Sequence, residues 1–230
     1  MFHVNFGVRQ GSVLAPFLFA VYLDDVAKFD CINQGCFIIL YADDILLISP
    51  SVCKLENLLH SCERELQSLD MSINFKKSGC LRIGPIYNAP CMNILSSTGI
   101  AIPWIAELRY LGVTLQQSHA FRCSLVQAKK SFYRAANAIF GNIGRVASEE
   151  VVLQLLKTKC MPILLYGLEA IPLYKYQLNA LDFVINRFFM KLFRTADITL
   201  VMQCQEQFGF DLPSVQLARR SHKFLNSMHK

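Results

Sequence analysis

The sequence has few charged residues, and this scarcity excludes one broad class of chain. Charged side chains make up 17% of the 230 residues against 53% hydrophobic ones, and the mean hydropathy is +0.32. Such a chain buries enough apolar surface to offset the entropy cost of ordering, so it is not disordered throughout. At roughly 100–200 residues per domain, its length predicts one large domain or two small ones.

Long hydrophobic runs and a secretory signal are also lacking. The longest apolar stretch, residues 36–49, is interrupted by Asp43 and Asp44, and it falls short of the ~20 residues that cross a bilayer. Residues 1–5 form neither a basic region nor a long apolar one, so no signal peptide is predicted. We therefore expect no membrane contact and an intracellular location, in the cytoplasm, the nucleus or both.

No two of the nine cysteines stand at the C-x-x-C spacing typical of a zinc or redox site. We interpret them as free thiols that mostly fill the core. The charge is unevenly distributed, because residues 1–115 hold 8 Lys and Arg against 10 Asp and Glu, whereas residues 116–230 hold 15 against 7. The basic half predicts a polyanionic partner, and clustered carboxylates in the first half suit cation binding.

Hydrophobic periodicity predicts mixed strands and helices up to about residue 118 and almost only helices after it. A helix is expected over 12–28 with Ser12 as N-cap, then two buried strands of one hairpin over 37–41 and 45–48, and an amphipathic helix over 52–69. Short strands are predicted over 72–75, 79–83, 92–95, 100–102 and 108–115. The predicted later helices cover 119–140, 148–166 with a break or kink at Pro162, 173–194 and 214–228.

Asp43 and Asp44 stand together between the two apolar strands of the predicted hairpin. Adjacent carboxylates repel each other and lose hydration there, and a divalent cation would relieve both costs. The alternative is a polar hairpin turn, since Asp is common in turns. From the pair alone both interpretations stay open.

The surrounding sequence resembles a known family. Tyr41-Ala42-Asp43-Asp44 is similar to the Tyr-Ala-Asp-Asp box of reverse transcriptases, and further blocks follow the order of that family. These blocks are Gly7-Val8-Arg9-Gln10-Gly11-Ser12, Asn74-Phe75-Lys76-Lys77-Ser78, Leu108-Arg109-Tyr110-Leu111-Gly112 and Leu165-Tyr166-Gly167. The resemblance is nearest to the polymerases of jockey-like non-long-terminal-repeat retrotransposons, and it covers residues 5–116 best.

The resemblance implies an RNA-directed DNA polymerase that binds an RNA template, a DNA primer and deoxynucleoside triphosphates, with Mg²⁺ or Mn²⁺ as cofactor. It implies that Asp43 and Asp44 are catalytic metal ligands and that Lys77 assists the departing pyrophosphate. It also implies that Arg9, Gln10 and Gly11 contact the nucleotide and template, and that Tyr110, Leu111 and Gly112 form the primer grip. If the resemblance is set aside, the alternative interpretations are a plain turn for the loop at Gln10, a solvated side chain for Lys77 and a core strand for Tyr110.

The implied fold class is α+β. Residues 1–117 would form a truncated polymerase palm, an antiparallel sheet with helices on one face, and residues 118–230 a helical thumb-like region. Basic side chains of that region are expected to contact the nucleic-acid backbone, although a charged helix face is often only solvated. They are Lys129, Lys130, Arg134, Arg187, Lys191 and Arg194, the last three spaced on one helical face.

The family's first catalytic aspartate precedes the block matched at Gly7, and no such block stands in residues 1–6. Asp24, Asp25 and Asp30 are interpreted as solvated surface. We therefore expect a fragment that binds metal weakly and is inactive by itself. The alternative is a non-catalytic nucleic-acid-binding remnant of a retroelement. The sequence carries no prediction of oligomeric state.

Overall fold

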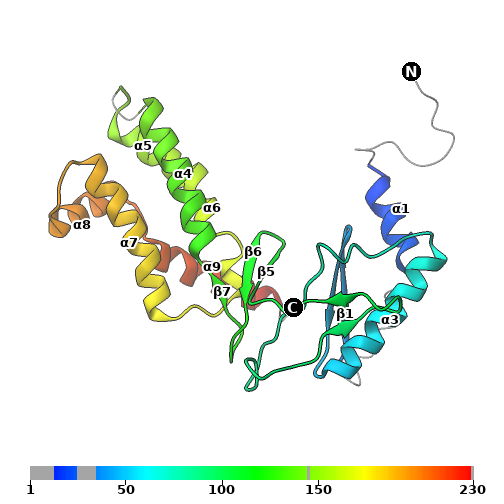
Figure 1. Ribbon diagram of the computed structural model, residues 1–230. Helices are drawn as coiled ribbons and strands as arrows, with labels where there is room; N and C mark the ends of the chain where they lie inside the picture. The colour runs from blue at the N-terminus through cyan, green and yellow to red at the C-terminus, as the bar shows by residue number, and fades with distance from the viewer. Residues whose placement is uncertain (1–12, 25–34, 144–145, 229–230) are drawn as a thin grey trace. The chain divides into compact units, whose positions relative to one another are not determined.

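The computed structural model describes residues 13–24, 35–143 and 146–228 (Figure 1). They divide into two compact units, one within residues 1–80 and 90–105 and the other within residues 81–89 and 106–230. The architecture is mixed α+β, with small antiparallel sheets in the N-terminal part and a largely helical C-terminal region. This confirms the coarse fold class. The described strands form three separate small sheets rather than the single sheet that was predicted.

The first unit is built on a hairpin of β1 (Phe37–Tyr41) and β2 (Asp44–Ile48), which pair antiparallel as predicted. The prediction that both strands are buried is wrong. Successive side chains of a strand point to opposite faces, and only one face of this hairpin is packed. The large side chains exposed on these strands are Phe37, Ile39, Tyr41 and Ile48.

Helix α3 (Val52–Ser68) lies beside this hairpin (Figure 1) and begins after Ser51, whose hydroxyl accepts the Lys54 N–H. It confirms the predicted amphipathic helix, and its buried Leu58, Cys62 and Leu66 share a cluster with Ile38 of β1.

Helix α1 (Ala15–Tyr22) begins later than predicted, with Leu14 as N-cap, and Leu23 is its C-cap. The predicted cap Ser12 and the predicted helix end at residue 28 lie outside the described residues.

Beyond α3 the chain forms little regular structure. Strands β3 (Ile94–Leu95) and β4 (Ala101–Ile102) pair around a turn at residues 96–99. The strands predicted over 72–75 and 79–83 are absent from the described structure. Backbone groups of residues 74–78 instead close a local turn, and Cys80 and Ile83 make isolated bridges only.

The second unit begins with a three-stranded antiparallel sheet in the order β5-β6-β7. Its strands are β5 (Glu107–Tyr110), β6 (Val113–Gln116) and β7 (Cys123–Ser124). The single strand predicted over 108–115 is therefore a hairpin that reverses at Leu111 and Gly112. Cys123 and Ser124, which belong to the helix predicted over 119–140, form strand β7 instead.

Helices make up the rest of the second unit (Figure 1). They are α4 (Val126–Ile143), α5 (Glu149–Leu155), the π-helical segment η2 (Leu156–Cys160), α6 (Met161–Leu164), the 3₁₀ helix η3 (Leu168–Ala170), α7 (Lys175–Leu192), α8 (Ile198–Gln207) and α9 (Pro213–Met228). The helix predicted over 148–166 with a break or kink at Pro162 is continuous through this residue: η2 passes directly into α6, with Pro162 in its first turn. Fully buried side chains, including Phe132, Leu164, Leu181 and Phe189, form one core cluster.

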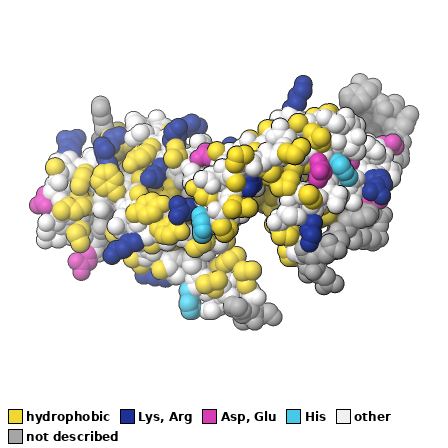
Figure 2. Space-filling view, turned by 60° about the horizontal axis from the view of Figure 1, so that its bottom comes forward, with side chains coloured by type: hydrophobic (Ala, Val, Ile, Leu, Met, Phe, Trp, Pro, Cys, Tyr) yellow, Lys and Arg dark blue, Asp and Glu magenta, His cyan; other side chains and the backbone are white. Residues whose placement is uncertain are grey.

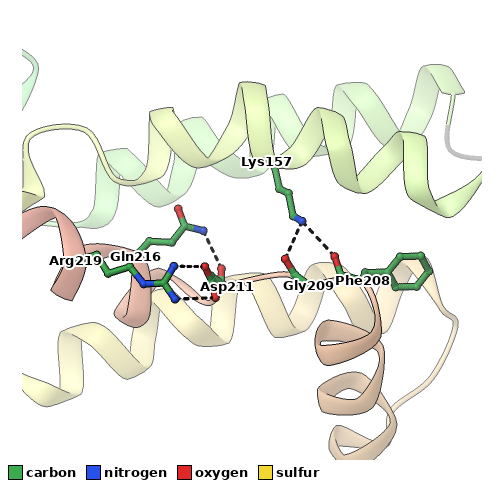
Figure 3. Close-up of polar contacts among 6 residues, drawn as sticks. All are labelled: Lys157, Phe208, Gly209, Asp211, Gln216 and Arg219. Carbon is green, nitrogen blue, oxygen red and sulfur yellow. Dashed lines mark hydrogen bonds and ion pairs between the residues drawn. The ribbon is translucent and has the colours of Figure 1, made fainter.

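Helix α8 was not among the predicted helices. Its pattern of residue types does not follow burial, because Ile198, Leu200 and Met202 are exposed whereas Gln205 is buried. The end of α8 is held by Lys157 of η2, whose ammonium donates to the carbonyls of Phe208 and Gly209 at 3.2 and 2.9 Å (Figure 3).

The α8–α9 connection also carries a local ion pair. Arg219 of α9 pairs with Asp211, and the Gln216 side chain donates to the Asp211 carbonyl (Figure 3).

Two expected absences concern membrane spans and disulfides. Within residues 13–24, 35–143 and 146–228, no helix has the length and apolarity to cross a bilayer. All described cysteines are free thiols, as predicted, and half of them are buried. The buried ones are Cys36, Cys62, Cys123 and Cys160.

Candidate active site

Asp43 and Asp44 lie at the tight end of the β1–β2 hairpin. Tyr41 pairs with Asp44, so Ala42 and Asp43 form a two-residue turn. Ala42 has a φ of +50°, a left-handed conformation that costs a non-glycine residue roughly 1–2 kcal/mol. Tight hairpin turns require a positive φ of this kind. The turn presents both carboxylates to solvent.

Among the described residues, neither the Asp43 nor the Asp44 carboxylate has a hydrogen-bond or ion-pair partner. Hard divalent cations such as Mg²⁺ prefer oxygen ligands. The pair therefore fits as part of a metal site. However, the described residues contain no group of three His, Cys, Asp or Glu side chains that could hold a metal, so the remaining ligands would come from elsewhere.

The hairpin is anchored through its packed face. Cys62 of α3 is fully buried beneath it, and burial, with a smaller contribution from the neighbouring Glu63, raises the pKa of its thiol to about 11. Leu47 of β2 also packs into a second cluster with Leu59 and Ile94. The apolar strands thus fix the position of the acidic turn at their end.

Lys77 belongs to the same unit but sits on a turn rather than at the end of a strand. Its N–H donates to the Asn74 carbonyl at 3.0 Å, and the Ser78 hydroxyl donates to the same oxygen at 3.0 Å. Phe75 anchors this turn in the cluster that also contains Leu47. Lys76 and Lys77 are both exposed, and the structure records no contact between Lys77 and the two aspartates.

The predicted primer-grip residues lie in the second unit, at the turn between β5 and β6. Leu111 and Gly112 both have positive φ, +46° and +84°, as a type I′ hairpin turn requires. The chain therefore reverses at these residues in a tight hairpin turn.

This turn contacts a second motif far along the chain. A Cβ added at Gly112 would lie 3.1 Å from Cε1 of Tyr166, and one added at Gly167 would lie 3.0 Å from Cγ2 of Val113. The Leu165-Tyr166-Gly167 block thus packs on the predicted primer grip. Sequence reasoning missed this contact, although a glycine in each block hinted at close approach.

The predicted backbone-binding residues are only partly arranged as expected. On α4, Lys130 and Arg134 are exposed and Lys129 is half-buried. On α7, Arg187 is exposed, and the Lys191 ammonium donates to Asn137 Oδ1 at 3.0 Å and lies over the Phe140 ring.

The placement of Arg194 on the same helical face is wrong. Helix α7 ends at Leu192, and Arg194 has a φ of +52°, which turns the chain away from the helix.

Several candidates cannot be placed. Arg9, Gln10 and Gly11 lie outside the described residues, as do Asp25 and Asp30.

Comparison with known families now bears on these motifs. Residues 2–115 match the family described as "Reverse transcriptase (RNA-dependent DNA polymerase)". This segment belongs to the reverse transcriptase family. The chain is also similar to the "RNA-directed DNA polymerase from mobile element jockey" of Drosophila funebris, at 29% identity over 140 residues, which cover 56% of this chain and 15% of that protein. No solved structure gives a significant match.

The reverse transcriptase segment contains both candidate hairpin turns. The Asp43-Asp44 turn and the Leu111-Gly112 turn lie within it, and it ends at Leu115 in β6. Most of the helical region lies beyond the family match. The chain spans only a small part of the length of the jockey relative.

Proposed function

We propose that this chain carries part of the catalytic centre of a jockey-like, non-long-terminal-repeat retrotransposon polymerase. Its reaction would add deoxynucleoside triphosphates to a DNA primer on an RNA template. The exposed Asp43-Asp44 turn at the end of an apolar hairpin, inside a reverse transcriptase segment, carries this proposal.

In this proposal Asp43 ligates Mg²⁺ or Mn²⁺ and Asp44 supports it. A divalent cation held there would neutralise charge on the nucleotide phosphates. Lys77 supplies a mobile positive charge near the departing pyrophosphate, and its exposure on a short turn is compatible with that role. Arg9, Gln10 and Gly11 would contact the template and the incoming nucleotide.

Residues 1–117 would act as the palm and residues 118–230 as the thumb. Tyr110, Leu111 and Gly112 would hold the primer end, and the packing of Tyr166 on Gly112 supports a rigid turn there. Exposed cations of α4 and α7 would contact nucleic-acid phosphates.

Among the described residues, no third His, Cys, Asp or Glu side chain joins Asp43 and Asp44, and a two-metal centre needs more ligands than these two. We therefore propose that the chain binds Mg²⁺ weakly and that nucleotide addition requires another carboxylate. The same observation favours a second candidate function, non-catalytic nucleic-acid binding through the basic helices.

Primer extension on an RNA template separates these two functions. We expect no incorporation by the 230-residue chain, and incorporation by a chain extended at its N-terminus with a family segment that carries a catalytic aspartate. Asp43→Asn should abolish the activity of the extended chain, and Asp70→Asn, at an exposed aspartate elsewhere in the first unit, should not. Each ~1.36 kcal/mol of lost transition-state stabilisation is a factor of ten in rate.

Two outcomes would contradict parts of this proposal. Asp43-dependent incorporation by the unextended chain would show that its own residues complete the centre. An inactive extended chain that still binds primer–template would favour the non-catalytic function.

A further inference from the structure

One face of α7 is free and carries aromatic and cationic side chains in a row. Tyr176 and Phe183 are 64% and 55% exposed, and Arg187 is also exposed. At about 100° per residue, positions separated by seven and eleven residues fall within roughly 40° of each other on a helix. The opposite face carries the buried residues Leu181, Ile185, Phe188 and Phe189.

The N-terminal end of this row is stiffened by stacking. The rings of Tyr174 and Tyr176 are nearly parallel, 16° apart with centroids at 5.9 Å. The Arg122 guanidinium lies 4.8 Å from the centroid of the Tyr174 ring, and its Nη2 donates to the Tyr174 hydroxyl at 3.4 Å. Tyr174 therefore supports Tyr176 in an ordered, solvent-facing position.

The charges on this helix are arranged for an anionic ligand. Lys175, Arg187 and Lys191 are exposed, whereas the one acidic residue of α7, Asp182, is half-buried and accepts the Ser214 N–H of α9 at 2.9 Å. Figure 2 shows one face of the molecule, on which Lys and Arg side chains lie among exposed hydrophobic ones.

We infer that the free face of α7 binds single-stranded nucleic acid. Unpaired bases stack on Tyr176 and Phe183, and phosphates meet Arg187 on the same face and Lys175 at the N-terminal end of the helix. Stacking platforms flanked by cations bind single strands with little sequence preference, because every base has a π-face. A duplex keeps its base faces occupied and would use the cations only. The inference rests on the proposed nucleic-acid binding and assigns a ligand to a helix outside the family match.

The test compares two labelled oligomers with the same number of phosphates, an oligothymidylate and an abasic chain, by fluorescence anisotropy on the full chain. We expect the base-bearing oligomer to bind about tenfold more tightly. The variant Tyr176→Ala with Phe183→Ala should lose this preference and keep its affinity for the abasic oligomer. Tyr176→Phe should retain the preference, and so should Met202→Ala, at an exposed apolar residue of α8.

Equal binding of the two oligomers by the unaltered chain would overturn stacking on α7 and leave phosphate binding intact. Failure to bind either oligomer would overturn the proposed nucleic-acid binding as well. The face of α7 would be a protein interface instead if two results came together. The unaltered chain would show no base preference, and the double variant of Tyr176 and Phe183 would lose self-association in ultracentrifugation. Circular dichroism of each variant shows whether it is folded.

Discussion

The ring of Tyr166 lies against Gly112. Its Cε1 atom would be 3.1 Å from a Cβ added at that glycine, and the neighbouring Gly167 approaches Val113 as closely. Two turns from distant parts of the sequence thus interlock through glycines. Both glycines also have positive φ, +84° at Gly112 and +69° at Gly167. Space and backbone conformation therefore require glycine at each turn.

The substitution Gly112→Ala should destabilise the second unit by about 1–2 kcal/mol, because alanine adds left-handed strain and crowds Tyr166. Urea unfolding followed by circular dichroism measures the loss. Gly141→Ala is the matched control, since nothing lies within 4 Å of its added Cβ and alanine favours the helix. Equal stability of the two variants would contradict the interlocked turns.

Lys157→Met should cost about 1.5–3 kcal/mol, the usual range for hydrogen bonds to a charged group. The ammonium is the cation at the C-terminal end of α8, where carbonyls lack helical partners. Thermal unfolding tests this, with Lys159→Met as control because Lys159 is exposed in the same π-helical segment. A control that destabilises as much as Lys157→Met would rule out a specific role for Lys157.

The buried thiol of Cys62 should resist alkylation. Its pKa of about 11, against an ordinary 9.0, lowers the thiolate fraction near pH 8 by about a hundredfold. Peptide mass spectrometry after iodoacetamide treatment should therefore show Cys53, exposed on the same helix, modified long before Cys62. Comparable rates at the two cysteines would show that α3 opens readily.

The raised pKa of the Cys62 thiol also determines the direction in which stability changes with pH. The folded state holds the Cys62 thiol proton more tightly than the unfolded state does. The contribution of this group to the free energy of unfolding is therefore complete below pH 9 and is lost as the pH rises toward 11. The free energy of unfolding should fall over this interval, and the fall should be smaller in Cys62→Ala. Urea unfolding at a series of pH values measures both slopes, and identical slopes would contradict the assignment.

Mn²⁺ should broaden the NMR signals of residues 41–45 at millimolar concentration. Weak binding is expected because, among the described residues, no third His, Cys, Asp or Glu side chain joins Asp43 and Asp44. Asp43→Asn should abolish the broadening, whereas Asp70→Asn should leave it unchanged. Broadening that persists in Asp43→Asn would favour a plain polar turn.

The sequence predicted local features better than distant contacts. The β1–β2 hairpin and α3 were predicted because their apolar periodicity is strong, whereas residues 108–115 were predicted as one strand and form a hairpin. The packing of Tyr166 on Gly112 depends on the tertiary fold, which no local pattern encodes. Arg194 was misplaced because helical spacing was extended past the true end of α7. The division at residue 117 and the roles of the site residues stay predictions.

The π-helical segment η2 takes up one residue without changing the rotational phase of α6. A π turn holds one residue more than an α turn, so the five residues of η2 turn the chain about as far as four residues of an α-helix would, at ~100° each. Deleting one residue between Leu156 and Cys160 would therefore restore ordinary winding and keep Tyr166 directed at Gly112. The irregular turn thus marks a point in this helix where the chain length can change without turning the residues beyond it.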